Sequence, residues 1–151
     1  MSILHMSLGA AEPETAARII AEVLRGPALS FPPCPGAWIA FADTDDGTAI
    51  EVYPNTTRVE AGAETIAFTT GAAETGPALA HVAVATGRPA EEVVEIGTRA
   101  GWLTRICNRG PFECVELWVE NRVLIEVLDP AMQRDYRAGM TAENWRAMFD
   151  L

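Results

Sequence analysis

The chain has 151 residues, 49% of them hydrophobic, which suits a single globular domain with a sizeable core. It carries 21 acidic and 11 basic residues, a formal net charge of −10, and every basic residue is an arginine. Nucleic acids and anionic membranes bind proteins through a basic face, which a chain this acidic lacks. Neither is therefore expected as a partner. No apolar run reaches the ~20 residues of a membrane span, and the N-terminus lacks the pattern of a secretion signal. We therefore expect a cytoplasmic protein.

The first half of the chain, residues 1–54, reads as strand, helix, strand, strand, strand. The helix of this half has its apolar positions on one stripe and ends at a Gly-Pro pair. The prolines of the segment that follows it allow only a brief edge strand. The expected elements are a strand at 3–8, a helix at 13–24, an edge strand within 28–36, and strands at 38–42 and 48–53 around a turn at 43–47.

The second half, residues 78–129, repeats this order after a linker at 55–77. The linker is rich in Thr, Gly, Ala and Glu and contains one weak strand pattern. A tail at 130–151 follows, and the two modules together form one domain. The expected elements are a strand at 65–70, a strand at 78–86, a helix at 89–100, strands at 102–107, 113–120 and 122–128, and tail helices at 131–137 and 141–149.

Glu126 lies in the middle of the otherwise apolar strand at 122–128. A strand of β-branched and aliphatic residues is typical of one that is buried on both faces. An ionised carboxylate buried without a partner costs several kcal/mol or more. Glu126 is therefore expected to be protonated, salt-bridged or bound to a metal.

Polar residues recur at the same place in both halves. His5 precedes Glu51 by 46 positions and His81 precedes Glu126 by 45, with each His on the first strand and each Glu on the last. Strand alternation points all four side chains away from the faces that pack on the helices. If the two sheets curve together, two imidazoles and two carboxylates converge in one cup, a donor set suited to a divalent first-row metal.

Each of these residues also has a purely structural interpretation. His5 would be a hydrogen-bonded core residue, His81 would cap a loop, and the two glutamates would pair with Arg105 or Arg122. The cysteines, Cys34, Cys107 and Cys114, are odd in number and lack C-x-x-C spacing, which favours reduced packing residues over a disulfide framework or a thiolate zinc site.

The walls of the cup follow from the same alternation. Trp38 and Trp118 are predicted to line an aromatic pocket, or else to serve as packing or dimer contacts. Glu116 shares the alternation of Trp118 and is expected to be solvated at a strand edge rather than to act as a base. Arg105 and Arg109 are candidates to anchor an acidic group of the substrate, or to pair with local acids.

At these residues the chain resembles the vicinal oxygen chelate superfamily, which includes glyoxalase I, extradiol dioxygenases, fosfomycin-resistance enzymes and bleomycin-binding proteins. The segments that carry the resemblance are Leu4-His5-Met6-Ser7-Leu8, Ala49-Ile50-Glu51-Val52, Ala80-His81-Val82-Ala83-Val84 and Leu124-Ile125-Glu126-Val127.

The resemblance implies an α+β fold of two paired βαβββ modules, whose sheets form an open cup around the metal, with short C-terminal helices and often a homodimer. It implies that His5, Glu51, His81 and Glu126 bind a divalent ion, Ni, Zn, Co, Mn or Fe. A His, Glu, His, Glu set is similar to that of bacterial glyoxalase I, although Gly9 stands where that enzyme has a basic residue for glutathione.

The function predicted from the resemblance is a metal-dependent isomerase or lyase acting on a small oxygenated substrate, with Glu51 or Glu126 moving the proton. Two alternatives remain open at this point. One is an Fe(II) dioxygenase that uses His5, His81 and Glu126 as a facial triad. The other is a metal-free protein that binds a small molecule, such as an antibiotic, in the same cup.

Overall fold

The computed structural model describes residues 4–44 and 46–150. Ile3, Asp45 and Leu151, which belong to the expected first strand, hairpin turn and tail, lie outside the described residues. The elements are β1 (His5–Ala10), α1 (Pro13–Leu24), β2 (Arg25–Ser30), β3 (Trp38–Ala42), β4 (Ala49–Pro54), β5 (Thr57–Ala61), β6 (Ile66–Thr70), β7 (Val82–Ala85), α2 (Ala90–Arg99), β8 (Thr104–Asn108), β9 (Glu113–Val119), β10 (Val123–Leu128), α3 (Pro130–Gly139) and α4 (Ala142–Phe149).

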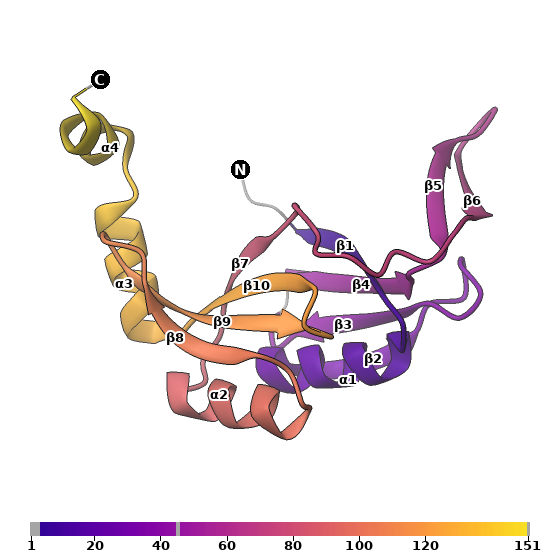
Figure 1. Cartoon of the computed structure of the whole chain (residues 1–151), viewed down its shortest axis with the longest axis horizontal. Coiled ribbons are helices and arrows are strands. Elements are labelled where there is room, and N and C mark those ends of the chain that lie inside the picture. Colours follow the sequence, from indigo (N-terminus) through magenta and orange to yellow (C-terminus); the bar gives the residue numbers. More distant parts are fainter. Residues whose placement is uncertain (1–3, 45, 151) are drawn as a thin grey trace.

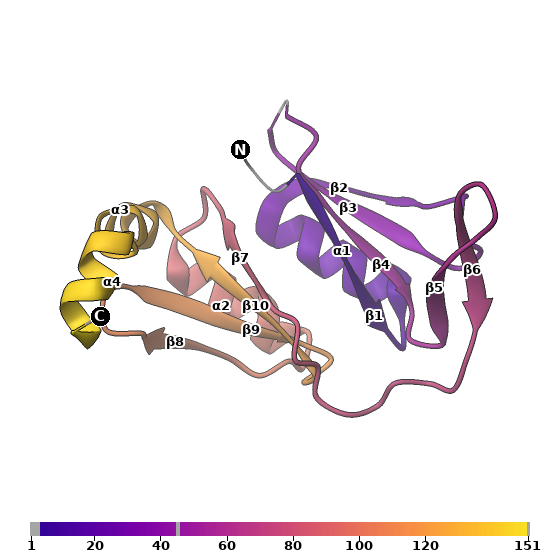
Figure 2. The ribbon, with the colours of Figure 1, turned by 90° about the horizontal axis from the view of Figure 1, so that it is seen from above.

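The strands form two four-stranded sheets with the same topology, in the orders β1-β4-β3-β2 and β7-β10-β9-β8. In each sheet the first strand pairs parallel with the last, and the other pairs are antiparallel. The predicted repeat of two βαβββ modules in an open α+β fold is therefore confirmed. Figure 2 shows the two sheets side by side, each with its helix beneath it.

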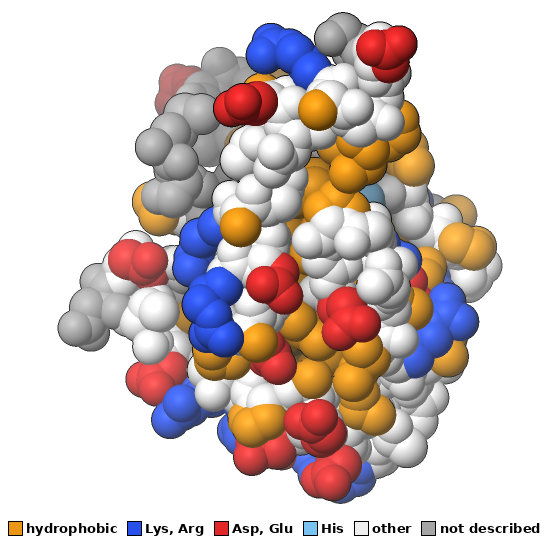
Figure 3. Space-filling model, turned by 90° about the vertical axis from the view of Figure 1, so that its left-hand side faces the viewer, with side chains coloured by type: hydrophobic (Ala, Val, Ile, Leu, Met, Phe, Trp, Pro, Cys, Tyr) orange, Lys and Arg blue, Asp and Glu red, His pale blue; other side chains and the backbone are white. Residues whose placement is uncertain are grey.

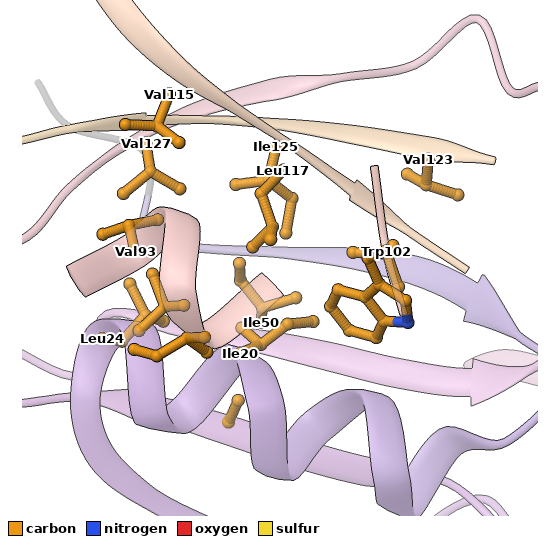
Figure 4. Packing of buried hydrophobic residues seen from close by; sticks show 14 of the residues in the cluster. Ile20, Leu24, Ile50, Val93, Trp102, Val115, Leu117, Val123, Ile125 and Val127 are labelled. Carbon is orange, nitrogen blue, oxygen red and sulfur yellow. The ribbon is translucent and has the colours of Figure 1, made fainter. Parts of the chain in front are cut away.

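The main hydrophobic core lies between the two helices and the sheet faces that cover them (Figure 4). From the helices it takes residues such as Ile20 and Val93, and from the sheets Ile50, Leu117 and Ile125, all at most 4% exposed. The helices present apolar stripes because their buried positions recur at helical spacing. Alternation in the strands then turns the intervening residues to the opposite face.

We call that opposite face, turned away from α1 and α2, the cup face. Two arms rise beyond the sheets on this side, at opposite ends of the molecule (Figure 1). One arm is the hairpin of β5 and β6, a separate two-stranded sheet. The linker was expected to contain one strand, at 65–70, so β5 was not predicted. Arg58 and Glu60 weaken the strand pattern of β5. The β5–β6 hairpin is anchored where Phe68 packs on Tyr53, with ring centroids 5.4 Å apart.

The other arm consists of α3 and α4. Asp129 caps α3 by accepting from the backbone N–H groups of Ala131 and Met132, and Thr141 caps α4 by accepting from Asn144 N–H. In α4 the rings of Trp145 and Phe149 contact each other, 4.8 Å apart, yet both side chains are about half exposed. Figure 3 views this end of the molecule, where hydrophobic side chains lie between acidic and basic ones.

The turn between β9 and β10, which belongs to the second module, contacts the first module. Glu120 and Asn121 both have positive φ, 50° and 57°, and Arg122 N–H donates to Val119 O, which together describe a tight turn in the left-handed backbone region. The Glu120 carboxylate accepts from the backbone N–H groups of Ala11 and Glu12, at 2.6 and 2.8 Å, and so caps the start of α1 in the other module.

At the other end of the modules, Thr86 Oγ1 donates to Val23 O, and the Arg88 guanidinium donates to Glu22 O. Between β1 and β7 the sheets leave a groove of about 270 Å³, with His5 among its lining residues. Within the described residues, no helix combines the length and hydropathy that crossing a bilayer would require.

Candidate functional site

In the first module, the predicted metal ligands His5 and Glu51 lie on the cup face. Ser7, two residues after His5 on β1, is paired directly with Glu51 on β4, so the three residues share one face. The Glu51 carboxylate accepts hydrogen bonds from Ser7 Oγ at 2.9 Å and from the Tyr53 hydroxyl at 2.7 Å, both to the same oxygen. His5 is exposed, and Glu51 is partly buried.

The second module repeats this register. Ala83, two residues after His81, is paired with Glu126 on β10 in the same parallel arrangement. His81 is exposed and immediately precedes β7, which begins at Val82 and is shorter than the predicted strand at 78–86. Each module thus presents one His and one Glu at matching positions, with Ala83 in the place that Ser7 occupies in the first module.

The four predicted ligands are not brought together within one chain. Among residues 4–44 and 46–150, no group of three or more His, Cys, Asp or Glu side chains is placed to hold a metal ion. That these four residues bind a metal therefore stays a prediction. The two sheets lie side by side over a shared helical layer (Figure 2). Strand register puts each His–Glu pair on the cup face of its own sheet.

Glu126, only 8% exposed, is salt-bridged, one of the three states that its apolar strand allowed. Its Oε1 accepts from Nε of Arg109 at 2.9 Å. The partner is neither Arg105 nor Arg122, the two that the sequence suggested. Arg109 also donates through Nη2 to Glu116 Oε1 at 2.6 Å, and therefore bridges the carboxylates of two neighbouring strands. Glu116 and Glu126 face each other directly in the β9–β10 pairing.

Glu116 is the most heavily hydrogen-bonded acid of the site, and the expectation that it is solvated is wrong. It is 3% exposed and accepts from Arg105 Nε at 2.7 Å and from the Trp118 indole N–H at 3.1 Å, besides Arg109. Burial raises the pKa of this carboxyl, but the three donors outweigh burial and hold the pKa at about 2. Glu116 is thus a fixed anion that holds two guanidinium groups on the cup face.

The two tryptophans predicted to line the pocket lie on different faces. Trp118 has the parity of Glu116 and Glu126, and its indole N–H reaches Glu116 on the cup face. Trp38 is paired with Val52, a fully buried core residue, and Arg18 of α1 lies over its ring at 4.9 Å. The pocket assignment of Trp38 is therefore wrong, because the β3–β4 register puts Ile39, not Trp38, beside Glu51.

Tyr53 is a site residue that the sequence interpretation missed. It lies two residues after Glu51 on the same strand, a spacing that places both on one face and could have indicated it. Its ring packs between Phe31 and Phe68, with centroids 5.8 and 5.4 Å away. Burial, and then the adjacent Glu51 carboxylate, raise the pKa of Tyr53 well above its usual range, so its hydroxyl stays protonated and donates to Glu51.

One end of the second cup face is closed by α3. Cys114 and Leu128, which share the parity of Glu116 and Glu126, are buried there, as is Met132 of α3. The Phe112 ring, just before β9, meets that of Tyr136 at 4.7 Å. All three cysteines are free, as predicted, and burial raises the pKa of the Cys114 thiol to about 11.

Comparison with solved structures identifies the fold. Lactoylglutathione lyase from Agrobacterium tumefaciens superposes with a TM-score of 0.54 at 14% identity, covering 83% of this chain and 91% of that one. The trypanothione-dependent glyoxalase I of Leishmania major gives 0.54 at 13% identity, covering 96% and 99%. The fosfomycin resistance protein FosX from Listeria monocytogenes, in complex with Mn(II), gives 0.52 at 10% identity, covering 88% and 95%.

These similarities establish that the chain has the same fold as lactoylglutathione lyase, glyoxalase I and FosX. No protein-family model matches the sequence, and no curated protein matches it significantly. At 10 to 14% identity the likeness concerns the fold, so activity must be argued from the residues of the site itself.

Proposed function

We propose that this chain is a cytoplasmic, divalent-metal-dependent enzyme of glyoxalase type, an isomerase or lyase whose small oxygenated substrate is chelated by the metal. The observation that carries the proposal is the repeated register of His5 with Glu51 and of His81 with Glu126, one pair on the cup face of each module. Two histidines and two carboxylates make a donor set that suits a divalent first-row ion. Lyases of this fold, and FosX with its Mn(II), support the choice of chemistry.

We further propose that the complete site forms between two copies of the chain. Each module supplies only two donors, and both cup faces open on the same side of the molecule (Figure 1). A two-fold axis that lays the first module of one copy over the second module of the other would bring two His and two Glu together, twice. The half-exposed Leu29 on the first cup face is consistent with a surface that a second copy covers.

The residues present fit such an ion. Glu51 is held by two hydroxyl donors at one oxygen, so its other oxygen is available, and an outer layer of donors commonly orients carboxylate ligands. When bound, the metal would supply Lewis-acid stabilisation of negative charge on substrate oxygens. Glu51 or Glu126 would take up and return the proton, since each carries a carboxylate at the cup face.

Two side chains would shape the substrate pocket of the second module. Trp118 presents a flat aromatic wall whose orientation is fixed by the hydrogen bond from its indole N–H to Glu116. Arg105 is bound to Glu116 through Nε, while its side chain is 56% exposed, which leaves other N–H groups free to bind an acidic group of a substrate.

The test is the metal content of the purified protein after reconstitution, compared with His5→Ala, Glu51→Ala, His81→Ala and Glu126→Ala. Each substitution should weaken metal binding by more than the roughly 10- to 100-fold that loss of an outer-layer partner costs. Glu95→Ala, at an exposed position of α2, is the matched control and should bind like the wild type.

Full metal content in both His5→Ala and Glu126→Ala would refute the metal site. A wild-type protein that takes up no ion but binds a small molecule would favour the metal-free binding protein instead. Oxygen uptake with catechols that depends on Fe(II) would favour the dioxygenase over the isomerase or lyase.

A further inference from the structure

Arg109 lies between two buried carboxylates and contacts both. Its Nε donates to Glu126 at 2.9 Å and its Nη2 donates to Glu116 at 2.6 Å, so one guanidinium donates from two of its nitrogens to two acids. Glu116 and Glu126 are 3% and 8% exposed, whereas the Arg109 side chain is 31% exposed and borders the cup. Arg109 therefore neutralises charge that burial would otherwise make costly.

The two carboxylates differ in what else holds them. Glu116 keeps two further donors, Arg105 Nε at 2.7 Å and the Trp118 indole at 3.1 Å. For Glu126, the side-chain hydrogen bond from Arg109 is the only one that the described part of the chain provides. Removing Arg109 would thus leave Glu116 paired but would leave Glu126 without a counter-ion.

We propose that Arg109 is an internal counter-ion, which occupies the Glu126 carboxylate in the metal-free protein and yields it when a divalent ion binds. This inference rests on the proposed function, because it takes Glu126 as a ligand. On metal binding, Arg109 would lose its bond to Glu126 and keep its bond to Glu116, which Arg105 continues to neutralise. Glu126 would exchange one cation for another and would never be buried with its charge unpaired.

Arg109 then sets the metal affinity of the site. It competes with the ion for Glu126, and a positive charge a few ångströms from a divalent cation also disfavours binding. When binding of one partner opposes binding of another, the affinity of the second typically changes by about 5- to 150-fold. Loss of Arg109 should therefore tighten metal binding, the opposite of what loss of an orienting residue would do.

The experiment is titration of the metal-free protein with Co²⁺ at one fixed pH, followed by the visible absorption of the bound ion and by calorimetry. Arg109→Gln should bind Co²⁺ on the order of tenfold more tightly than the wild type, with an unchanged absorption spectrum. The control is Arg99→Gln, which removes a positive charge from the helical layer, where Arg99 pairs with Glu22 and is 62% exposed. Its Co²⁺ affinity should stay within about twofold of the wild type, because solvent and salt screen a distant exposed charge. Arg109→Lys keeps the charge but loses the fork, and should fall between wild type and Arg109→Gln.

Equal or weaker Co²⁺ binding by Arg109→Gln would overturn the counter-ion role while leaving the metal site intact. If Arg109→Gln is unfolded by circular dichroism, Arg109→Lys decides: affinity above that of the wild type supports the inference, and affinity at or below it refutes it. A wild-type protein that binds no Co²⁺ would instead refute the proposed function on which the inference rests.

Discussion

At the scale of single residues, Glu116 and Glu126 illustrate how much a neighbouring strand decides. Both are acids within apolar strands, both face the cup, and the β9–β10 pairing sets them directly opposite each other. Two carboxylates so placed repel each other unless cations intervene. Here β8 and the residue after it supply the cations, because Arg105 is paired with Glu116 and Arg109 directly follows the strand.

The depressed pKa of Glu116 predicts a loss of stability in acid. Its folded value, about 2, lies below the usual 4.5, so the ionised carboxylate stabilises the native state above pH 4.5. That contribution, roughly 3 kcal/mol, should disappear as the pH falls from 4.5 towards 2. Urea unfolding at pH 6 and pH 2 compares the two ends of this range, and Glu116→Gln should lack this part of the pH dependence. An acid loss of the same size in Glu116→Gln would show that other carboxylates cause it.

At the scale of elements, the β9–β10 turn does more than connect two strands. Glu120 adopts a positive φ, which is uncommon for a residue other than glycine, and its carboxylate reaches the first backbone N–H groups ahead of α1. An anion at a helix N-terminus accepts hydrogen bonds from otherwise unpaired donors and interacts favourably with the positive end of the helix dipole. One turn in the second module thus stabilises the helix of the first.

Glu120→Gln should therefore destabilise the protein by about 1 to 2 kcal/mol, because it removes a charged acceptor from two backbone donors. Chemical denaturation at neutral pH measures the change. The control is Glu95→Gln, which removes an exposed charge from α2 and should shift the free energy of unfolding by less than about 0.5 kcal/mol. Equal effects of the two substitutions would indicate a general charge effect and no specific cap.

At the scale of the whole molecule, the two modules share one helical layer and leave two cup faces open on the same side (Figures 1 and 2). The β5–β6 hairpin and the α3–α4 arm stand at opposite ends of these faces. A half-site on each face is the arrangement that a symmetric pair of chains can complete, since a two-fold axis exchanges the ends.

A shared site predicts complementation between two inactive variants. His5→Ala with Glu51→Ala empties the first half-site, and His81→Ala with Glu126→Ala empties the second. Neither double variant alone should bind metal tightly, whereas a mixed dimer, co-expressed with two affinity tags, should bind one ion per pair of chains. Mass measurement by light scattering gives the oligomeric state. A mixed dimer without metal, beside a wild type that binds it, would exclude a site shared in this way.

The sequence by itself determined the local structure, because helical and strand periodicities act over a few residues. The helix at 13–24 and the strand at 38–42 begin and end where they were predicted, and the repeated order of elements predicted the paired modules. Alternation also placed Glu51, Glu116, Trp118 and Glu126 on the faces where they lie.

Tertiary structure decided what those faces meet. Which arginine reaches Glu126, whether Glu116 is covered, and whether Trp38 faces the cup depend on strand register and on which strands lie side by side. That the four predicted ligands do not meet within one chain also follows from how the sheets are placed beside each other. Alternation tells which side of a strand a residue occupies, but packing between distant elements determines its partner.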